Sequence, residues 1–197
     1  MNDRAPLPRS YELLSRDDTA LLVVDVQSKL VRAIRGHQRM VWNIRRLIDA
    51  ARVFDVPIAA TEQYPQGLGH TEPELRDRLG EIAEKSTFSC GSCSEIFTDL
   101  GNRNVEKILV TGIEAHVCVQ QTSLDLLAAG FGVYIAVDAV GSRYQVDYDT
   151  ALRRLESSGA TLTTTESAMF EWCEASGTPQ FKQISALVKE TPPSEDD

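Results

Sequence analysis

The sequence contains few cysteines and no long apolar run. Its four cysteines are too few and too unevenly spaced for the disulfide framework of a small secreted protein, so we expect reduced thiols. No run approaches the roughly 18 apolar residues of a membrane span. The N-terminal stretch MNDRAPLPRS also lacks the apolar core of a secretory signal. These absences predict a soluble, cytoplasmic protein.

Basic residues are also scarce. Lys and Arg number 20 against 29 Asp and Glu, which gives a net charge of −9, and the basic residues are scattered along the chain. A protein that binds the phosphate backbone needs a clustered basic surface. We therefore expect neither a nucleic-acid partner nor a membrane partner.

The length and composition predict one domain. A chain of 197 residues that is 42% hydrophobic can bury a substantial core in a single unit. We place the domain at residues 19–190, after an N-terminal extension at 1–18. The polar stretch TPPSEDD at 191–197 is expected to be a disordered acidic tail.

Short β-branched runs alternate with helical patterns, which is typical of a parallel α/β sheet. The expected strands are 19–25, 56–61, 106–112, 132–138 and, more weakly, 160–165. Apolar residues at helical spacing predict helices near 41–54, 124–128, 151–155, 167–174 and 181–189. The fold class is therefore a three-layer α/β/α domain with a mostly parallel sheet of five or six strands. We expect a long loop at 62–69.

The carboxyl ends of the predicted strands bring several reactive residues to one edge. Ligands in open parallel sheets bind there, and this edge holds Asp25, the loop at Glu62, Cys118 and Asp138. A cysteine that opens a helix lies near the positive end of the helix dipole, which lowers the thiol pKa. Cys118 is thus a candidate nucleophile, although buried cysteines also pack as small apolar side chains.

A nucleophilic thiol needs a base and a group that stabilises negative charge. Asp25, at the end of the first strand, is the nearest base by topology. Lys85 in EKSTFSC could orient that carboxylate and hold developing charge. The alternatives are a turn aspartate and a solvated surface lysine.

Three stretches together resemble the isochorismatase-like cysteine hydrolases, a superfamily that includes nicotinamidases. They are LLVVDVQ with Asp25, EKSTFS with Lys85, and ILVTGIEAHVCVQQTSLDLLAAGFGVYIAVDAVGSR with Cys118. GIEAHVCVQQT and TEQYPQGLGHT point to the subgroup of isochorismatase domain-containing proteins. The resemblance implies a Rossmann-like sheet and a catalytic triad of Asp25 as base, Lys85 as charge partner and Cys118 as nucleophile.

The resemblance also implies the chemistry. The family pattern places a non-proline cis peptide between Ile113 and Glu114, where it helps to aim backbone N–H groups, including that of Cys118, into an oxyanion hole. The implied reaction is hydrolysis of a C–N bond in a small molecule through a thioester on Cys118. Homo-oligomers are usual in the superfamily, so we expect a dimer or tetramer.

The sequence departs from the nicotinamidases at the metal site. Those enzymes carry metal-binding histidines after the second strand, where this chain has TEQYPQGLGHT with His70 alone, out of three histidines in all. A catalytic zinc ion needs about three protein ligands. We therefore expect no metal and no cofactor, and we interpret His70 as an ordinary loop or interface residue.

Two other functions stay open at this point. The chain could be a catalytically weak interaction module on the same fold, or a thiol-redox protein that uses Cys90 and Cys93 in FSCGSCSE. The redox motif needs a strand directly before the pair, and the charged residues EIAEKSTF do not read as a buried strand. His116, two residues before Cys118, is expected to contact neighbouring residues rather than the thiol. Candidate substrate-pocket residues flank the triad or lie on the expected covering loop: Gln27, Tyr64, Phe88 and Glu114.

Overall fold

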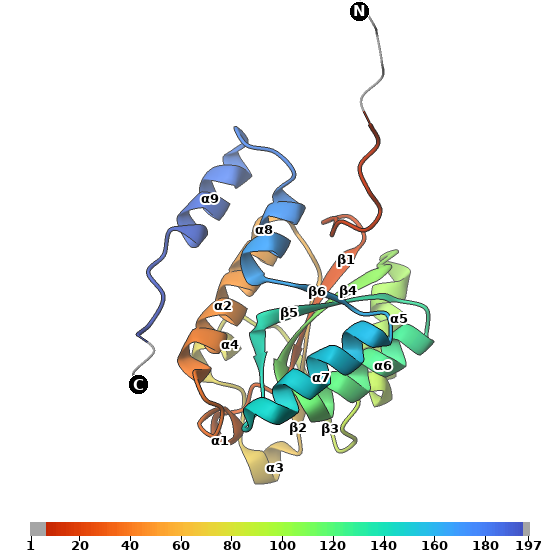
Figure 1. Ribbon diagram of the computed structural model, residues 1–197, viewed down its shortest axis with the longest axis vertical. Helices are drawn as coiled ribbons and strands as arrows, with labels where there is room; N and C mark the ends of the chain where they lie inside the picture. Colours follow the sequence, from red (N-terminus) through yellow and green to blue (C-terminus); the bar gives the residue numbers. More distant parts are fainter. Residues whose placement is uncertain (1–6, 195–197) are drawn as a thin grey trace, which may run out of the picture.

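A six-stranded, fully parallel sheet forms the centre of the computed structural model, which describes residues 7–194 (Figure 1). The strands are β1 (Thr19–Val24), β2 (Ile58–Gln63), β3 (Ile82–Lys85), β4 (Lys107–Ile113), β5 (Gly132–Gly141) and β6 (Thr161–Thr163). Their order is β3-β2-β1-β4-β5-β6, and every neighbouring pair is parallel. The predicted fold class is confirmed, with six strands.

Helices cover both faces of the sheet. They are α1 (Ser28–Val31), α2 (His37–Val53), α3 (Pro65–Leu68), α4 (Pro73–Arg76), α5 (Ser94–Asn102), α6 (Gln120–Ala128), α7 (Gln145–Ser157), α8 (Thr165–Cys173) and α9 (Pro179–Val188). Helices α2, α8 and α9 lie on one face, and α5, α6 and α7 lie on the other (Figure 1). Two short turns complete the chain: a 3₁₀ turn at Cys90–Ser92 and a π-helical turn at Ala115–Val119.

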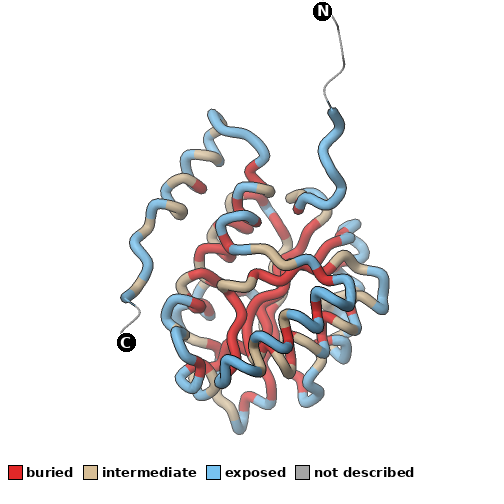
Figure 2. The backbone as a smooth tube through the Cα atoms, viewed as in Figure 1, coloured by how far each residue is buried: buried red, intermediate tan, exposed pale blue. Residues whose placement is uncertain are grey.

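The side chains of strand β1 contribute to the hydrophobic cores on both faces of the sheet. All six of its residues are buried, and alternate side chains enter opposite cores, because successive residues of a strand point to opposite faces. Leu21 and Val23 belong to the core under α2 and α8, whereas Leu22 and Val24 belong to the core under α6 and α7. Figure 2 shows this buried sheet between exposed outer helix surfaces.

Strand β3 was not among the strands expected from the sequence, because the charged stretch EIAEKSTF does not read as a buried strand. It lies at the edge of the sheet and pairs only with β2, so it needs no continuous apolar run. Ile82 and Ala83 are half-buried and Glu84 is exposed, whereas Lys85 is buried at the end of the strand. The charged pattern is therefore that of an edge strand.

The predicted loop at 62–69 is also partly wrong. Strand β2 runs on to Gln63 in parallel pairing with β3, and α3 occupies most of the rest. Tyr64 joins the two elements with a φ of 39°, in the left-handed region. Strand β2 therefore delivers more residues to the carboxyl edge than the sequence pattern suggested.

The N-terminal segment packs against the domain. Leu14 is fully buried in the core under α2 and α8, and the Tyr134 hydroxyl donates to the Glu12 carbonyl at 2.8 Å. Residues 191–194 form no helix or strand. The rest of the predicted extension and tail, residues 1–6 and 195–197, lies outside the described residues. Within 7–194, no helix has the length and apolarity required to cross a membrane.

Candidate active site

The candidate site lies where the strand order reverses. Strands β1 and β4 are neighbours, yet their connections run to opposite sides of the sheet, and ligands bind at such switch points. Asp25 directly follows β1, and Cys118 lies in the π-helical turn that follows β4. Lys85, the last residue of β3, reaches the same edge. These residues are all buried, Asp25 at 0% and Cys118 at 7% exposure.

Both oxygens of the Asp25 carboxylate are held by donors from other strands. Lys85 Nζ donates to Oδ2 at 2.6 Å, and the Thr61 hydroxyl donates to Oδ1 at 2.7 Å. The backbone of Asp25 has a φ of 53°, a left-handed conformation that costs about 1–3 kcal/mol for most non-glycine residues. Such strain is concentrated at functional sites.

The Lys85 ammonium is enclosed by oxygen atoms. Besides Asp25, Gln63 Oε1 lies 2.7 Å from Nζ and the carbonyl oxygens of Phe88 and Thr87 lie 3.0 Å and 3.2 Å away, so the three ammonium hydrogens are shared among four acceptors. The side chains of both ion-pair partners are fully buried. A buried charge is tolerated only when it is paired and hydrogen-bonded, and this cage meets both conditions.

The Cys118 thiol is protonated in this environment. Burial raises its pKa, the negative charge of Asp25 and hydrogen bonding to that carboxylate raise it further, and the nearby Lys85 ammonium only partly opposes them. The expected lowering of this pKa by a helix start is therefore wrong. Because the thiol keeps its proton, an attack through sulfur needs a base beside it, and Asp25 is that neighbour.

The end of β4, just before the turn that carries Cys118, depends on Gly112. Its φ is 109°, and a Cβ atom there would lie 2.0 Å from the Val24 carbonyl oxygen. Only glycine permits this close approach of β4 to the end of β1. The following Ile113–Glu114 peptide bond is cis. The Glu114 side chain accepts from Arg143 Nε at 2.9 Å and from the Arg143 backbone N–H at 3.2 Å.

The candidate pocket residues have different surroundings. Gln27 is buried and spans the loop after β2: its Nε2 donates to the carbonyls of Gln63 and Gly69, and its Oε1 accepts from the Gln63 N–H. These bonds use both amide hydrogens, so Gln27 supports the loop. Tyr64 and Phe88 are 58% and 53% exposed, and their rings are open to solvent.

Sequence reasoning missed Thr61 and Gln63. Both lie at the end of β2, two residues apart and hence on the same face, and both contact the Asp25–Lys85 pair. Threonine and glutamine carry no chemical signature of their own. Their place after a strand that neighbours β1 was the available signal.

The two histidines considered above make contacts away from the ion pair. His70 Nδ1 lies 3.0 Å from Glu62 Oε2, and His116 Nδ1 lies 3.0 Å from Ser142 Oγ. Across residues 7–194 the structure contains no group of three or more His, Cys, Asp or Glu side chains that could hold a metal ion.

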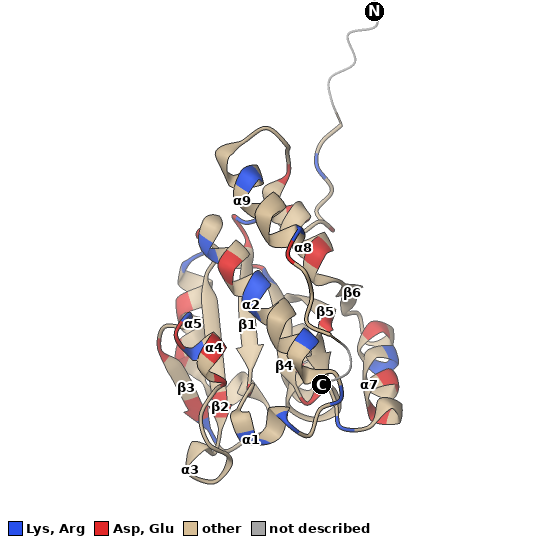
Figure 3. Cartoon of the chain, turned by 90° about the vertical axis from the view of Figure 1, so that its left-hand side faces the viewer, with Lys and Arg blue, Asp and Glu red and all other residues tan. Residues whose placement is uncertain are grey.

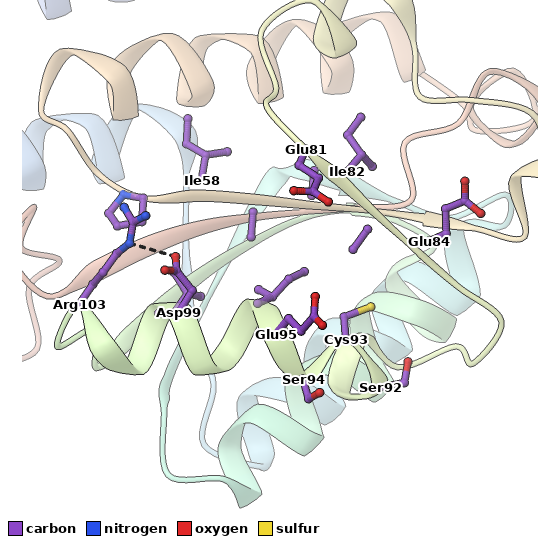
Figure 4. A pocket seen from close by; sticks show the side chains of 16 residues that line it. Ile58, Glu81, Ile82, Glu84, Ser92, Cys93, Ser94, Glu95, Asp99 and Arg103 are labelled. Atoms are coloured by element: carbon purple, nitrogen blue, oxygen red, sulfur yellow. Dashed lines mark ion pairs between the residues drawn. The ribbon is translucent and has the colours of Figure 1, made fainter.

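Cys90 and Cys93 do lie between a strand and a helix, but in different surroundings. Cys90 is fully buried, and its sulfur lies 3.5 Å from Thr61 Oγ1. Cys93 lines a groove of about 710 Å³ between α5 and strands β2 and β3. Figure 4 shows its sulfur in that groove with Glu84, Glu95 and Asp99. All described cysteines are free thiols.

Comparisons with known proteins agree with this architecture. The isochorismatase domain family matches residues 19–167. Isochorismatase domain-containing protein 2A from Mus musculus is 38% identical over 177 residues, which cover 90% of this chain and 85% of that protein.

Solved structures share this fold. The MAR1 ribonuclease structure from Caenorhabditis elegans is 39% identical, with a TM-score of 0.85 and coverage of 93% of this chain and 96% of that one. The YcaC protein from Escherichia coli, described as an octameric hydrolase of unknown specificity, is 21% identical, with a TM-score of 0.83 and coverage of 91% and 92%. The chain therefore belongs to the isochorismatase-like hydrolases, in the subgroup of isochorismatase domain-containing proteins.

Proposed function

We propose that this protein is a cysteine hydrolase that cleaves a C–N bond of a small amide. Cys118 is the nucleophile, Asp25 is the general base and Lys85 is the charge partner of the base. The observation that carries the proposal is the buried Asp25 carboxylate, fixed by Lys85 at 2.6 Å and Thr61 at 2.7 Å beside a protonated, buried thiol. A fixed base beside a thiol is the arrangement that activates a cysteine nucleophile.

The reaction has two stages. Asp25 accepts the Cys118 proton while the sulfur attacks the carbonyl carbon, and it then passes that proton to the departing amine as the C–N bond breaks. The acyl group of the substrate stays on Cys118 as a thioester. Water attacks the thioester, Asp25 takes a proton from the water, and that proton returns to the sulfur as the acid leaves. Lys85 keeps its positive charge throughout.

The negative charge that develops on the carbonyl oxygen needs donors. In this proposal, backbone N–H groups of the turn after β4, including that of Cys118, form the oxyanion hole next to the Ile113–Glu114 peptide. A donor of this kind contributes about 3 kcal/mol to the transition state. The ion pair with Arg143 holds Glu114 in the same turn.

The exposed rings of Tyr64 and Phe88 suit the entrance of the site, where they would favour a flat or apolar amide. We propose a homo-oligomer in which a second subunit closes this entrance. The octameric E. coli relative supports self-association. Light scattering coupled to size-exclusion chromatography measures the number of subunits, and a monomer at working concentration would exclude this closure.

The direct test is a panel of small amides assayed with the wild type, Cys118→Ala and Asp25→Asn. We expect hydrolysis by the wild type and loss of at least about 100-fold with either variant, the range for a general base or nucleophile. Hydrolysis by Cys118→Ala at the wild-type rate would remove the nucleophile assignment.

RNA belongs in the same panel, because one structural relative is described as a ribonuclease. The net charge of −9 disfavours binding to a phosphate backbone, and Figure 3 shows basic residues dispersed among acidic ones in that view. RNA cleavage that disappears in Cys118→Ala, without amide hydrolysis, would favour the ribonuclease function instead. A protein without either activity would fit the interaction module.

A further inference from the structure

Asp25 has a second set of partners besides Lys85 and Cys118. The Thr61 hydroxyl contacts Oδ1 at 2.7 Å, and Cys90 Sγ contacts the same hydroxyl at 3.5 Å. Asp25 and Cys90 are each 0% exposed, and Thr61 is 1% exposed. These contacts therefore form a buried chain of three side chains that solvent does not interrupt.

The chemistry of the three groups decides which of them donates and which accepts each hydrogen bond in this chain. An ionised carboxylate only accepts hydrogen bonds, so the single hydrogen of the Thr61 hydroxyl points to Asp25. The contact with Cys90 must then run from the S–H group to Thr61 Oγ1. Burial, with the nearby charge of Asp25, raises the pKa of Cys90 to about 11, so the thiol hydrogen is present at neutral pH.

Cys90 is itself anchored to the segment that carries the nucleophile. Its backbone N–H donates to Thr122 Oγ1 at 2.9 Å, and Thr122 lies in α6, four residues after Cys118. The chain thus connects the base on β1, the end of β2 and the helix that follows the nucleophile.

We infer that Thr61 and Cys90 are positioning residues for the base: the S–H to O–H to carboxylate chain holds the Asp25 carboxylate plane fixed toward Cys118. This inference rests on the proposed function. Lys85 alone holds only Oδ2, which leaves the carboxylate free to rotate about its last bond. The hydroxyl on Oδ1, from a different strand, removes that freedom. The Cys-x-x-Cys motif therefore contributes one hydrogen-bond donor to the site, and Cys93 is not required.

Four titratable groups face Asp25 or affect its charge. They are Lys85 from β3, Cys118 from the π-helical turn, and Cys90 and Cys93 from the segment before α5. Only Lys85 is cationic, and it is unchanged in the variants below. A change in the pH dependence on substitution of Thr61 therefore reports loss of the hydroxyl.

The test is the rate of Cys118 alkylation by iodoacetamide as a function of pH, followed by mass spectrometry of the Cys118 peptide. Thr61→Val removes a hydrogen bond to a charged group, so the carboxylate takes up a proton at higher pH. We expect the acidic half-maximum of the rate to rise by about one pH unit. At the pH of the wild-type midpoint, the alkylation rate of the variant should be about fivefold lower than that of the wild type. Thr61→Ser should restore the wild-type profile, and Thr61→Ala carries the same expectation as Thr61→Val if the valine does not fold.

Cys90→Ala should shift the profile in the same direction by about a third of that amount, since it weakens the hydroxyl donor rather than removing it. Cys90→Ser, which keeps a donor, should reverse the shift. Profiles of the Thr61→Val or Thr61→Ala variants that coincide with the wild type would overturn the inference. Different results would contradict the proposed function itself. These are a wild-type Cys118 that does not react with iodoacetamide, or an Asp25→Asn variant whose Cys118 is alkylated at the wild-type rate.

Discussion

Two lysine–aspartate pairs, each with a buried lysine, flank strand β1, one at each end. At the carboxyl end, Lys85 Nζ lies 2.6 Å from Asp25, and at the amino end Lys107 Nζ lies 2.9 Å from Asp18. Each lysine comes from another strand of the sheet. The two pairs share residue types, distance and burial of the lysine, so the ion pair alone does not make a catalytic site.

The surroundings of the two pairs differ. Lys107 lies 4.0 Å from the centre of the Tyr11 ring and donates to the Leu13 carbonyl at 3.2 Å, which ties the N-terminal segment to the sheet. Asp18 keeps 23% side-chain exposure. Asp25 has no exposed surface and meets a hydroxyl and a thiol. The amino-end pair ties the N-terminal segment to the sheet, and the carboxyl-end pair is the one that we propose for proton transfer.

The largest expected effect is on catalysis at the carboxyl end. Asp25→Asn removes the proposed base, so the kcat/KM of amide hydrolysis should fall by about 10²- to 10⁴-fold. Asp18→Asn at the amino end is the matched control and should keep kcat/KM within about twofold. Steady-state kinetics of the two purified variants decides this, and an equal loss in both would remove the distinction between the pairs.

Substitution of each lysine compares what the two pairs contribute to the free energy of unfolding. Lys85→Met leaves a fully buried carboxylate without its partner, so the free energy of unfolding should fall by about 3–5 kcal/mol. Lys107→Met should cost only about 1–2 kcal/mol, because Asp18 retains contact with water. Urea denaturation measures both values. The reverse order would mean that the amino-end pair, not the pair at the site, is the more important one.

Substitution of Gly112 tests the close approach of β4 to β1. In Gly112→Ala the added Cβ meets the Val24 carbonyl at 2.0 Å in a left-handed backbone, so we expect a loss of about 2–3 kcal/mol and slower alkylation of Cys118. Gly101→Ala in α5, where nothing lies within 4 Å, should be neutral or stabilising by up to about 1 kcal/mol. Thermal unfolding of both variants checks the contrast, which fails if they behave alike.

The smallest expected effect concerns pH. Burial alone raises the pKa of Glu62, but hydrogen bonds from the Thr71 N–H, His70 and the Thr71 hydroxyl outweigh it and lower the pKa. A lowered folded-state pKa gives stability that is present above the unfolded value of about 4.3 and is lost as pH falls through the folded value. Glu62→Gln should therefore reduce the loss of unfolding free energy between pH 5 and 3, by about 1 kcal/mol or less. An unchanged acid slope would contradict this.

The sequence predicted most of the fold because strands buried on both faces read as apolar runs. Strand β1 and strand β4, with its seven buried residues, are of this kind. Strand β3 was missed because an edge strand keeps charged residues. The positions of Asp25, Cys118 and Lys85 followed from strand ends and from the family resemblance.

The parts that could not be predicted depend on long-range packing. The contacts of Thr61 and Gln63 exist only because β2 lies between β1 and β3. The raised pKa of Cys118 depends on burial and on the nearby carboxylate, which outweigh the helix start that the sequence displayed. Spacing along the chain does not encode such neighbours.

The central claim is that Cys118 carries the acyl group. The most direct measurement is mass spectrometry of the acid-quenched protein during turnover of a small amide found by the panel, in the wild type and in Cys118→Ala. The account predicts an added mass equal to the acyl part of the substrate on the Cys118 peptide, and none in the variant. Turnover by the variant at the wild-type rate, with Cys118 unmodified in the wild type, would contradict it.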